Sequence, residues 1–302
     1  MTKHFLPIPA LKGRTSANAA FQMAYTTFAA KDQGKPKRPL IILHGYGENG
    51  PINFERIATL AAQAGHEVSV IDWPGHGASD KICDIPFYAE TSHDYTAAAL
   101  EFFAFIQKKY PDGIDILAHS MGGAIFFDAL GSSAGQSYQK MIHQMILSAP
   151  MFALRGMGYV SEVLYASALG RKMLSFMARH HRTPKPFNFP LKDLTENPDE
   201  QKEILKRQKE QTSDCWANSE SDWILAANEM MTNVAAQTAD CWKNFKGQAH
   251  LWASPGDKIT DGLRSITIFK KLLPQGIVHK TNLPHRIHTH PEVIREMIKL
   301  IG

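Results

Sequence analysis

The sequence has few cysteines and no long apolar run, and each shortage excludes a class of protein. Its only cysteines are Cys83, Cys215 and Cys241, with no CxxC pair. An odd number does not form a disulfide framework, so we expect three reduced thiols in a reducing compartment. No stretch approaches the ~20 apolar residues of a membrane span, and the first residues lack the apolar run of a signal peptide. These absences predict a cytoplasmic protein, with peripheral contact to the inner membrane left open.

The chain also has little net charge. Lys and Arg number 33 against 29 Asp and Glu, which gives a formal charge of +4. Such a mild excess does not indicate nucleic-acid binding. Hydrophobic residues make up 44% and charged residues 21% of the 302-residue chain, as in soluble globular proteins. Disordered, collagen-like and coiled-coil classes are therefore excluded, and the chain can bury a large core without a disulfide or metal.

Short apolar runs alternate with amphipathic helical stretches in two parts of the chain. The predicted strands are 39–43, 68–71, 114–118, 144–148, 249–253 and 276–282, and the predicted helices are 52–64, 96–109, 124–130, 262–273 and 291–300. This alternation indicates an α/β fold, a mostly parallel central sheet flanked by helices. Between them, 151–247 has helical stretches without a convincing strand. We expect residues 1–150 and 248–302 to form the core and 151–247 an inserted helical cap.

The sharpest motif is AHSMGG, residues 118–123, between a predicted strand and a predicted helix. A serine among small residues in such a turn is typical of the nucleophile elbow, which exposes the Ser120 hydroxyl at the sheet edge. The N–H of Met121, at the start of the helix, can then donate to a developing oxyanion. A second motif, HGYG at 44–47, offers the N–H of Tyr46 as the other donor. Ordinary serine and glycine turns are the alternatives, and the strand-end context favours the catalytic interpretation.

A nucleophilic serine needs a base, and the base needs an orienting acid. In this type of fold they follow in the order Ser, Asp or Glu, His. Asp257 lies just after the strand 249–253, whereas its rival Asp261 is expected to cap the next helix. The last predicted strand is followed by three histidines, His285, His288 and His290. We favour His285, because it comes first and its loop can reach back towards the elbow.

Other residues are expected around the substrate. His44 and His119 flank the two motifs and are predicted to line the site. Met151, Trp216 and Trp223 are predicted to contact an acyl chain, since apolar and Met-rich surfaces adapt to flexible ligands; ordinary packing of cap helices is the alternative. Basic residues in the cap could approach lipid head groups, although a solvated helix face is favoured; they are Arg171, Lys172, Arg179, Arg182 and Lys185. No cluster has metal-ligand spacing, so we expect no metal and no other cofactor.

Taken together, the motifs resemble the α/β-hydrolase fold in its monoacylglycerol lipase and bacterial lysophospholipase branch. The resemblance is carried by HGYGE, DWPGHGASD, AHSMGGA, LSAPMF, PGDKITD and PHRIHTHPEVIR. It implies a triad of Ser120, Asp257 and His285. It also implies an oxyanion hole formed by Tyr46 and Met121. The chain departs from the family at Ala118, where glycine is usual, and at Arg286, where an acidic residue often follows the histidine.

The expected activity is hydrolysis of carboxylic esters of monoacyl lipids, lysophospholipid or monoacylglycerol, through an acyl-enzyme. A short-chain esterase, a lactonase or a serine aminopeptidase would keep the same triad and differ in the cap. Dehalogenases and epoxide hydrolases of this fold have Asp at the elbow, where this chain has Ser120. A non-catalytic binding protein of the same fold is the remaining alternative, although it should have lost a triad member. The expected partner is a lipid or other small ester, and no nucleic acid.

Overall fold

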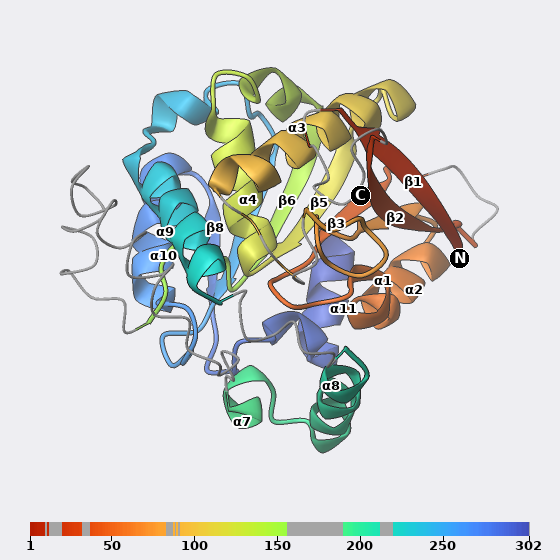
Figure 1. Ribbon diagram of the computed structural model, residues 1–302. Helices are drawn as coiled ribbons and strands as arrows, with labels where there is room; N and C mark the ends of the chain where they lie inside the picture. Colours follow the sequence, from red (N-terminus) through yellow and green to blue (C-terminus); the bar gives the residue numbers. More distant parts are fainter. Residues whose placement is uncertain are drawn as a thin grey trace.

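The protein forms an eight-stranded sheet in the order β1-β2-β4-β3-β5-β6-β7-β8 (Figure 1). The computed structural model describes residues 1–9, 11, 20–31, 37–82, 87, 89, 91–155, 190–211 and 220–301. The strands are β1 (Thr2–Ile8), β2 (Phe21–Phe28), β3 (Leu40–Leu43), β4 (Val68–Ile71), β5 (Ile114–His119), β6 (Ile142–Ser148), β7 (Gln248–Ala253) and β8 (Ile277–Lys280). From β4 to β8 all neighbours pair in parallel, whereas β1 and β2 are antiparallel additions at one edge. The predicted α/β class with a mostly parallel sheet is confirmed.

The central strands are apolar because helices cover both of their faces. The sequences LIIL of β3 and VSVI of β4 are buried at every position. Continuous burial of this kind is typical of a parallel sheet between two helical layers. The edge strand β8 has exposed residues at both ends and half-buried residues between them. The parallel strands end together at one edge of the sheet, which is where the motifs found in the sequence lie.

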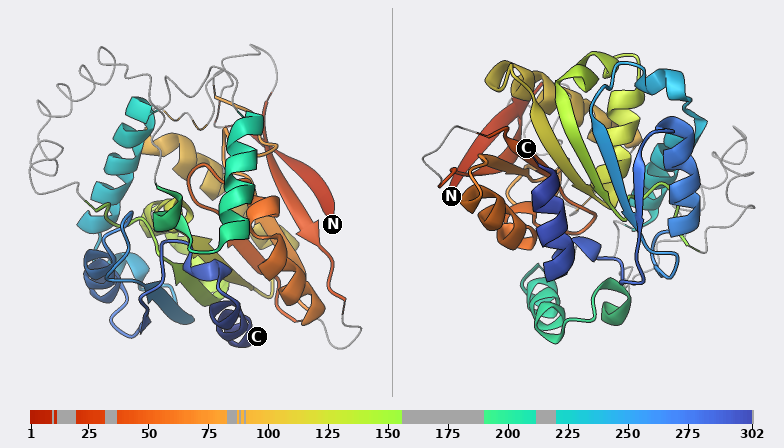
Figure 2. Two further views of the ribbon diagram at one scale, coloured as in Figure 1. Left: turned by 90° about the horizontal axis from the view of Figure 1, so that it is seen from below. Right: turned by 180° about the vertical axis from the view of Figure 1, so that it is seen from behind.

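Helices form a layer on each face of the sheet (Figures 1 and 2). On one face, α3 (Ser92–Lys109), α4 (Met121–Gly131), α9 (Glu220–Ala236) and α10 (Gly262–Leu272) contribute to the larger apolar core. On the other face, α2 (Glu55–Gln63) and α11 (Pro291–Leu300) pack against a second core. Short connecting helices are α1 (Gly50–Asn53), η1 (Gln136–Met141), η3 (Ala239–Trp242) and η4 (Ile287–Thr289).

Local sequence signals set several helix ends. The Asp261 side chain accepts a hydrogen bond from the Arg264 N–H at 3.0 Å and caps α10, as the sequence predicted. Pro291 occupies the first turn of α11, where its missing N–H costs nothing. Lys108 and Lys109 end α3, where cations favour the negative end of the helix dipole.

The region predicted as a cap contains two different kinds of helix. The short α7 (Leu191–Leu194) and α8 (Pro198–Gln211) lie outside the two layers, beyond the carboxyl ends of the parallel strands (Figure 1). By contrast, α9 packs against α4 and α3 within the larger core. The division into a core and a cap at 151–247 stays a prediction. The described residues do not include Trp216 or the basic cap residues. Of the three cysteines they include Cys241, which is a free thiol, but not Cys83 or Cys215.

The lengths and hydropathies of the helices bear on membrane insertion. Within the part of the chain that the structure describes, no helix combines the length and the apolar character needed to cross a bilayer.

Candidate active site

Ser120 lies in the sharp turn between β5 and α4, with a backbone that few serines adopt. Its φ is 49° and its ψ is −120°, a region that favours glycine. Two main-chain hydrogen bonds hold the turn: the Ser120 N–H donates to Ser148 O at 3.1 Å, and the Met151 N–H donates to Ser120 O at 2.9 Å. Elbow strain of this kind presents the hydroxyl at the carboxyl edge of the sheet.

Small residues around the elbow allow other backbone segments to approach. A Cβ on Gly122 would lie 2.5 Å from His44 O and 2.6 Å from Leu43 O, both backbone atoms at the end of β3. A Cβ on Gly123 would lie 2.8 Å from Cβ of Pro150. Ala118, at the position where the family has glycine, is fully buried in β5 and keeps its place in the sheet. The motif therefore has small residues where the strands converge.

Three side chains from three strand ends form one hydrogen-bonded row. The Ser120 hydroxyl donates to His285 Nε2 at 3.0 Å, and His285 Nδ1 donates to the Asp257 carboxylate at 2.8 Å. All three residues are less than 8% exposed. Because one imidazole nitrogen faces an acceptor and the other faces the hydroxyl, His285 has the tautomer that can accept the serine proton. The structure thus brings together the serine, acid and histidine selected from the sequence.

The Asp257 carboxylate is held by four donors. One oxygen accepts the N–H groups of Ile259 and Thr260 at 2.8 and 3.2 Å, and the other accepts the Thr260 hydroxyl at 2.6 Å and His285. Burial alone would raise the pKa of this carboxyl, but the adjacent histidine and these hydrogen bonds together lower it below its ordinary value. The group therefore stays ionised through the neutral range and well into acid.

The loop after β3 carries Tyr46 and is fixed by buried side chains. The Gly45 N–H donates to the Glu48 carboxylate at 2.7 Å, and the Gly47 N–H donates to His76 Nε2 at 3.1 Å. Burial lowers the pKa of His76 well below its ordinary value, so this nitrogen is a neutral acceptor. Asp72 anchors the start of α1 by accepting the Gly50 N–H at 2.8 Å.

Trp223 of α9 contacts both predicted oxyanion residues. Its ring lies 3.8 Å from the Tyr46 ring, measured between centroids, and its indole N–H donates to Sδ of Met121 at 3.3 Å. The backbone N–H of Met121 is the first of α4, where no acceptor within the helix is available. Trp223 is buried, so it closes one side of the elbow.

Met151 and His44 were also predicted to line the site, and their surroundings differ. Met151 is buried beside the elbow through its hydrogen bond to Ser120. His44 is fully buried, with Nδ1 donating to Gly45 O at 2.7 Å and Nε2 accepting the Trp73 N–H at 3.0 Å. These two hydrogen bonds tie the His44 side chain to the Tyr46 loop and to Trp73. Its role towards substrate stays a prediction.

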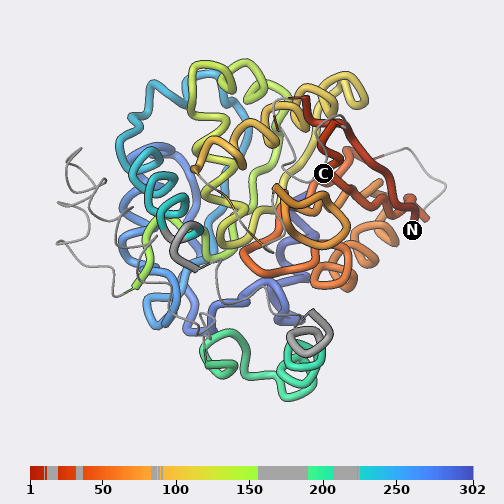
Figure 3. The backbone as a smooth tube through the Cα atoms, viewed as in Figure 1, coloured from red at the N-terminus to blue at the C-terminus, as the bar shows by residue number. Residues whose placement is uncertain are grey.

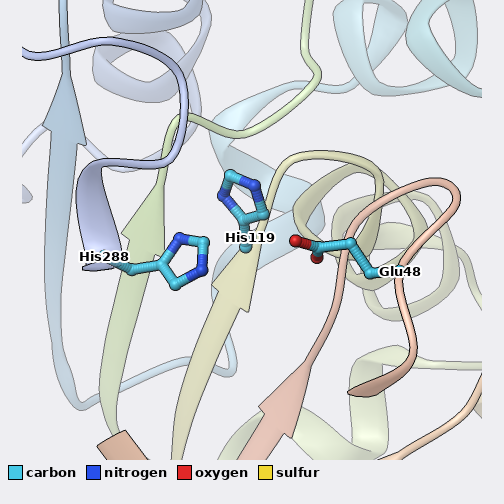
Figure 4. A group of neighbouring side chains, drawn as sticks. All are labelled: Glu48, His119 and His288. Atoms are coloured by element: carbon cyan, nitrogen blue, oxygen red, sulfur yellow. The ribbon is translucent and has the colours of Figure 1, made fainter. Parts of the chain in front are cut away.

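Glu48, His119 and His288 are the residue types that bind transition metals, and they converge beneath the elbow (Figure 4). One ligand atom from each lies within 4.8 Å of the others. Burial, with the Arg286 charge nearby, lowers the pKa of both histidines well below the ordinary value. However, the Arg286 guanidinium lies 3.5 Å from the same carboxylate, and this charge opposes a second cation. His119 Nδ1 donates to Ser148 O at 2.9 Å, so we assign the cluster to packing beside the Ser120 turn.

Asp128 on α4 is a buried carboxyl outside the triad. Asn233 of α9 donates to it at 3.3 Å. Burial, with Glu229 nearby, raises its pKa to about 7 from an ordinary 3.8. The folded state therefore holds this proton more tightly than the unfolded state, and stability falls as pH rises from about 4 to about 7.

Asp128→Asn is expected to stabilise the protein above pH 7, because the amide cannot ionise. The gain is on the order of 4 kcal/mol at most, since one pKa unit equals about 1.4 kcal/mol, and it should vanish near pH 4. Urea unfolding from pH 4 to 8 measures it. Asp199→Asn, at a side chain that is 91% exposed, serves as the control. An unchanged pH dependence in Asp128→Asn would remove the assignment.

Sequence reasoning missed the residues that support the site from a distance. Glu48 and His76 lie within motifs that the sequence singled out, HGYGE and DWPGHGASD, yet only the fold shows that they fix the Tyr46 loop. Arg286 was noted as a departure from the family pattern. Its buried ion pairs became visible only in the structure.

A mostly parallel sheet with Ser120, Asp257 and His285 at its carboxyl edge is the architecture of the α/β hydrolases. The chain belongs to the family described as serine aminopeptidase, S33, whose model matches residues 34–272. A probable alcohol acetyltransferase from Saccharomyces cerevisiae is 32% identical over 97 residues. That match covers 31% of this chain and only 26% of the yeast protein.

Several solved structures share the fold. The monoacylglycerol lipase of Paleococcus ferrophilus has a TM-score of 0.64 and 17% identity, covering 92% of this chain and 98% of that one. A soluble variant of the Saccharomyces cerevisiae monoglyceride lipase, in complex with a substrate analog, has a TM-score of 0.69 and 14% identity, covering 98% and 96%. An esterase from Exiguobacterium antarcticum has a TM-score of 0.61 and 15% identity, covering 93% and 96%. Because the sequence identities are only 14–17%, these similarities show the fold alone.

Proposed function

We propose that the protein is a serine hydrolase that cleaves carboxylic esters of monoacyl lipids. The observation that carries this proposal is the row of hydrogen bonds from Ser120 through His285 to Asp257, at 3.0 and 2.8 Å. These distances match what a nucleophile, its base and an orienting acid require. The tautomer of the histidine is the one that general-base catalysis needs.

In the proposed mechanism, His285 Nε2 takes the hydroxyl proton while Ser120 Oγ attacks the ester carbonyl carbon. The carbonyl oxygen becomes an oxyanion, and the N–H groups of Tyr46 and Met121 stabilise it. His285 then protonates the leaving alcohol, which departs and leaves an acyl-enzyme. A water molecule, deprotonated by the same histidine, attacks the acyl carbon. The bond from this carbon to Ser120 Oγ then breaks, His285 returns the proton to Oγ, and the fatty acid leaves. Asp257 stabilises the imidazolium in both halves of the reaction.

A monoacyl lipid is the proposed substrate because three features favour it. The sequence motifs resemble those of lysophospholipases and monoacylglycerol lipases, and the fold is similar to that of two lipases of this class. In addition, the elbow has apolar neighbours in Met151 and Trp223, which suit an acyl chain. In this proposal, residues 151–247 act as the cap over the site. The enzyme works in the cytoplasm, with peripheral contact to a membrane that holds its substrate.

Serine aminopeptidase activity is the second candidate, since it is the activity in the description of the family. It would use the same three residues on an amide with a free α-amino group. Short-chain esterase and lactonase activities would also keep the triad. Only the substrate separates these candidates.

A matched substrate panel tests the proposal. We expect turnover of lysophosphatidylcholine or monoacylglycerol, and of long-chain p-nitrophenyl esters in preference to the acetate, because the apolar site contributes binding energy along the chain. Amino-acyl amides should not be cleaved. A fluorophosphonate probe should label the native protein at Ser120, as identified by peptide mass spectrometry.

Cleavage of only short esters would contradict the lipid assignment and leave the triad intact. Cleavage of amino-acyl amides alone would favour the aminopeptidase. A failure of the probe to react would contradict serine catalysis altogether, because this reaction needs an activated serine.

A further inference from the structure

Arg286, the residue after the triad histidine, is a buried cation between three segments of the chain. Its side chain is only 6% exposed. One guanidinium nitrogen lies 3.1 Å from Glu200 of α8, and the other terminal nitrogen lies 3.5 Å from Glu48 of the Tyr46 loop. Both carboxylates are also largely buried, with side-chain exposures of 16% and 10%. Ion pairs this far from water are screened little, so their geometry constrains the groups that they join.

The helix α7 holds the same loop through its backbone. The His285 N–H donates to Asp193 O at 3.2 Å, and the Arg286 N–H donates to Leu194 O at 2.9 Å. Two successive residues of the histidine loop are therefore hydrogen-bonded to two successive residues of α7. Figure 3 shows the blue trace that leads to α11 running beside the green trace of α7 and α8.

Glu200 is itself fixed by the segment that joins the two helices. Its second carboxylate oxygen accepts the hydroxyl of Thr195 at 2.6 Å, and Thr195 is fully buried. The backbone oxygen of Thr195 accepts the side-chain amide of Gln201 at 2.7 Å. The carboxylate facing Arg286 is thus oriented by contacts other than the ion pair.

On its other side, Arg286 reaches the loop that carries Tyr46. The Glu48 carboxylate that it faces also accepts the Gly45 N–H at 2.7 Å. Gly45 precedes Tyr46, whose N–H is a proposed oxyanion donor. The guanidinium therefore joins the loop of the general base, the loop of an oxyanion donor and the helix α8. A planar guanidinium can direct a separate nitrogen to each carboxylate, whereas a lysine ammonium is a single point charge.

We propose that Arg286 is a positioning residue, through which the docked α7–α8 segment sets the relative placement of His285 and the Tyr46 loop. This inference rests on the proposed function, because it assigns to Arg286 the alignment of the same catalytic groups. Docked, the segment holds the base and the oxyanion donor in reacting geometry. Without the Glu200–Arg286 pair, the guanidinium that faces Glu48 loses the partner that fixes it to α8. The two loops are then held less firmly relative to each other, and the transition state loses more stabilisation than substrate binding does.

The test compares Glu200→Gln with Asp199→Asn in the full-length protein. Both variants remove one negative charge from the first turn of α8, but the Asp199 side chain is 91% exposed and pairs with Lys202 on the surface. We expect Glu200→Gln to lower both kcat on a p-nitrophenyl ester and the rate constant of fluorophosphonate inactivation by roughly tenfold. KM should change less than twofold, and Asp199→Asn should match the wild type in all three quantities.

Arg286→Lys is the second variant, because it keeps the positive charge and avoids two unpaired buried carboxylates. It should lower the inactivation rate at least as much as Glu200→Gln does. Thermal melts establish that each variant is folded. A lower melting temperature with an unchanged inactivation rate would show a purely structural role and overturn the proposal, as would a rise in KM at constant kcat.

The test of Arg286 can be distinguished from the test of the proposed function. If the native protein reacts with the probe but cleaves no lipid ester, the substrate class fails and the inactivation rates still test Arg286. If the native protein does not react with the probe, serine catalysis fails, and the positioning role fails with it.

Discussion

Ser120→Ala should lower ester hydrolysis by about a million-fold, to the level of the detection limit. Without Oγ no acyl-enzyme can form, and the remaining oxyanion donors act on a water-driven reaction only. Because alanine has the same backbone requirements as serine at a φ of 49°, the melting temperature should stay close to that of the native protein. Steady-state assays and the absence of a probe adduct in the intact mass measure the effect.

A matched control is Ser254→Ala. Ser254 is a buried serine near the Asp257 loop, and its hydroxyl has no hydrogen-bond partner among the described residues. This variant should retain native turnover. Substantial turnover in Ser120→Ala would contradict the assignment of the nucleophile.

The second large effect is expected for Asp257→Asn, with a fall in kcat of about ten-thousand-fold, as for the same change in other serine triads. The carboxylate accepts a hydrogen bond from His285 Nδ1, whereas an amide can present an N–H at that place. The imidazole would then adopt the wrong tautomer. KM should change little. The lowered pKa of the native carboxyl means that any loss of wild-type activity between pH 5 and 7 belongs to another group.

Asp261→Asn is the control for this variant. Asp261 caps α10 from the same loop, and asparagine is an equally good cap, so both stability and turnover should persist. A loss of activity in Asp261→Asn comparable to that in Asp257→Asn would contradict the choice between the two aspartates.

The sequence predicted best what depends on local pattern. The strand at 68–71 and the helix at 291–300 were predicted with the bounds that the structure shows, because short apolar runs and an initial proline mark them. The three residues of the hydrogen-bonded row, Ser120, Asp257 and His285, were also selected from local context. In a parallel sheet the ends of neighbouring strands meet, so the order of motifs along the chain is enough to place them together.

Long-range packing was not predictable in the same way. The β1–β2 pair was not expected. The edge strand β1 is exposed at most positions and gives a weak apolar signal, whereas β2 is largely buried but has polar residues among its apolar ones. The sequence predicted helical character for 151–247 as a whole, but this character could not distinguish a helix over the strand ends from one packed on α4, as α9 is. Likewise, Arg286 pairs with residues that lie far from it in the chain, and no spacing rule indicates such pairs.

The backbone of Ser120 has a consequence for efforts to make this protein more durable. A serine held at a φ of 49° and a ψ of −120° costs on the order of 1–3 kcal/mol. Glycine would relieve that strain, so a redesign that optimised backbone conformation alone would select glycine and remove the proposed nucleophile. Durability and turnover thus compete at this single position. Engineering for heat resistance should leave the elbow untouched and seek its gains elsewhere in the chain.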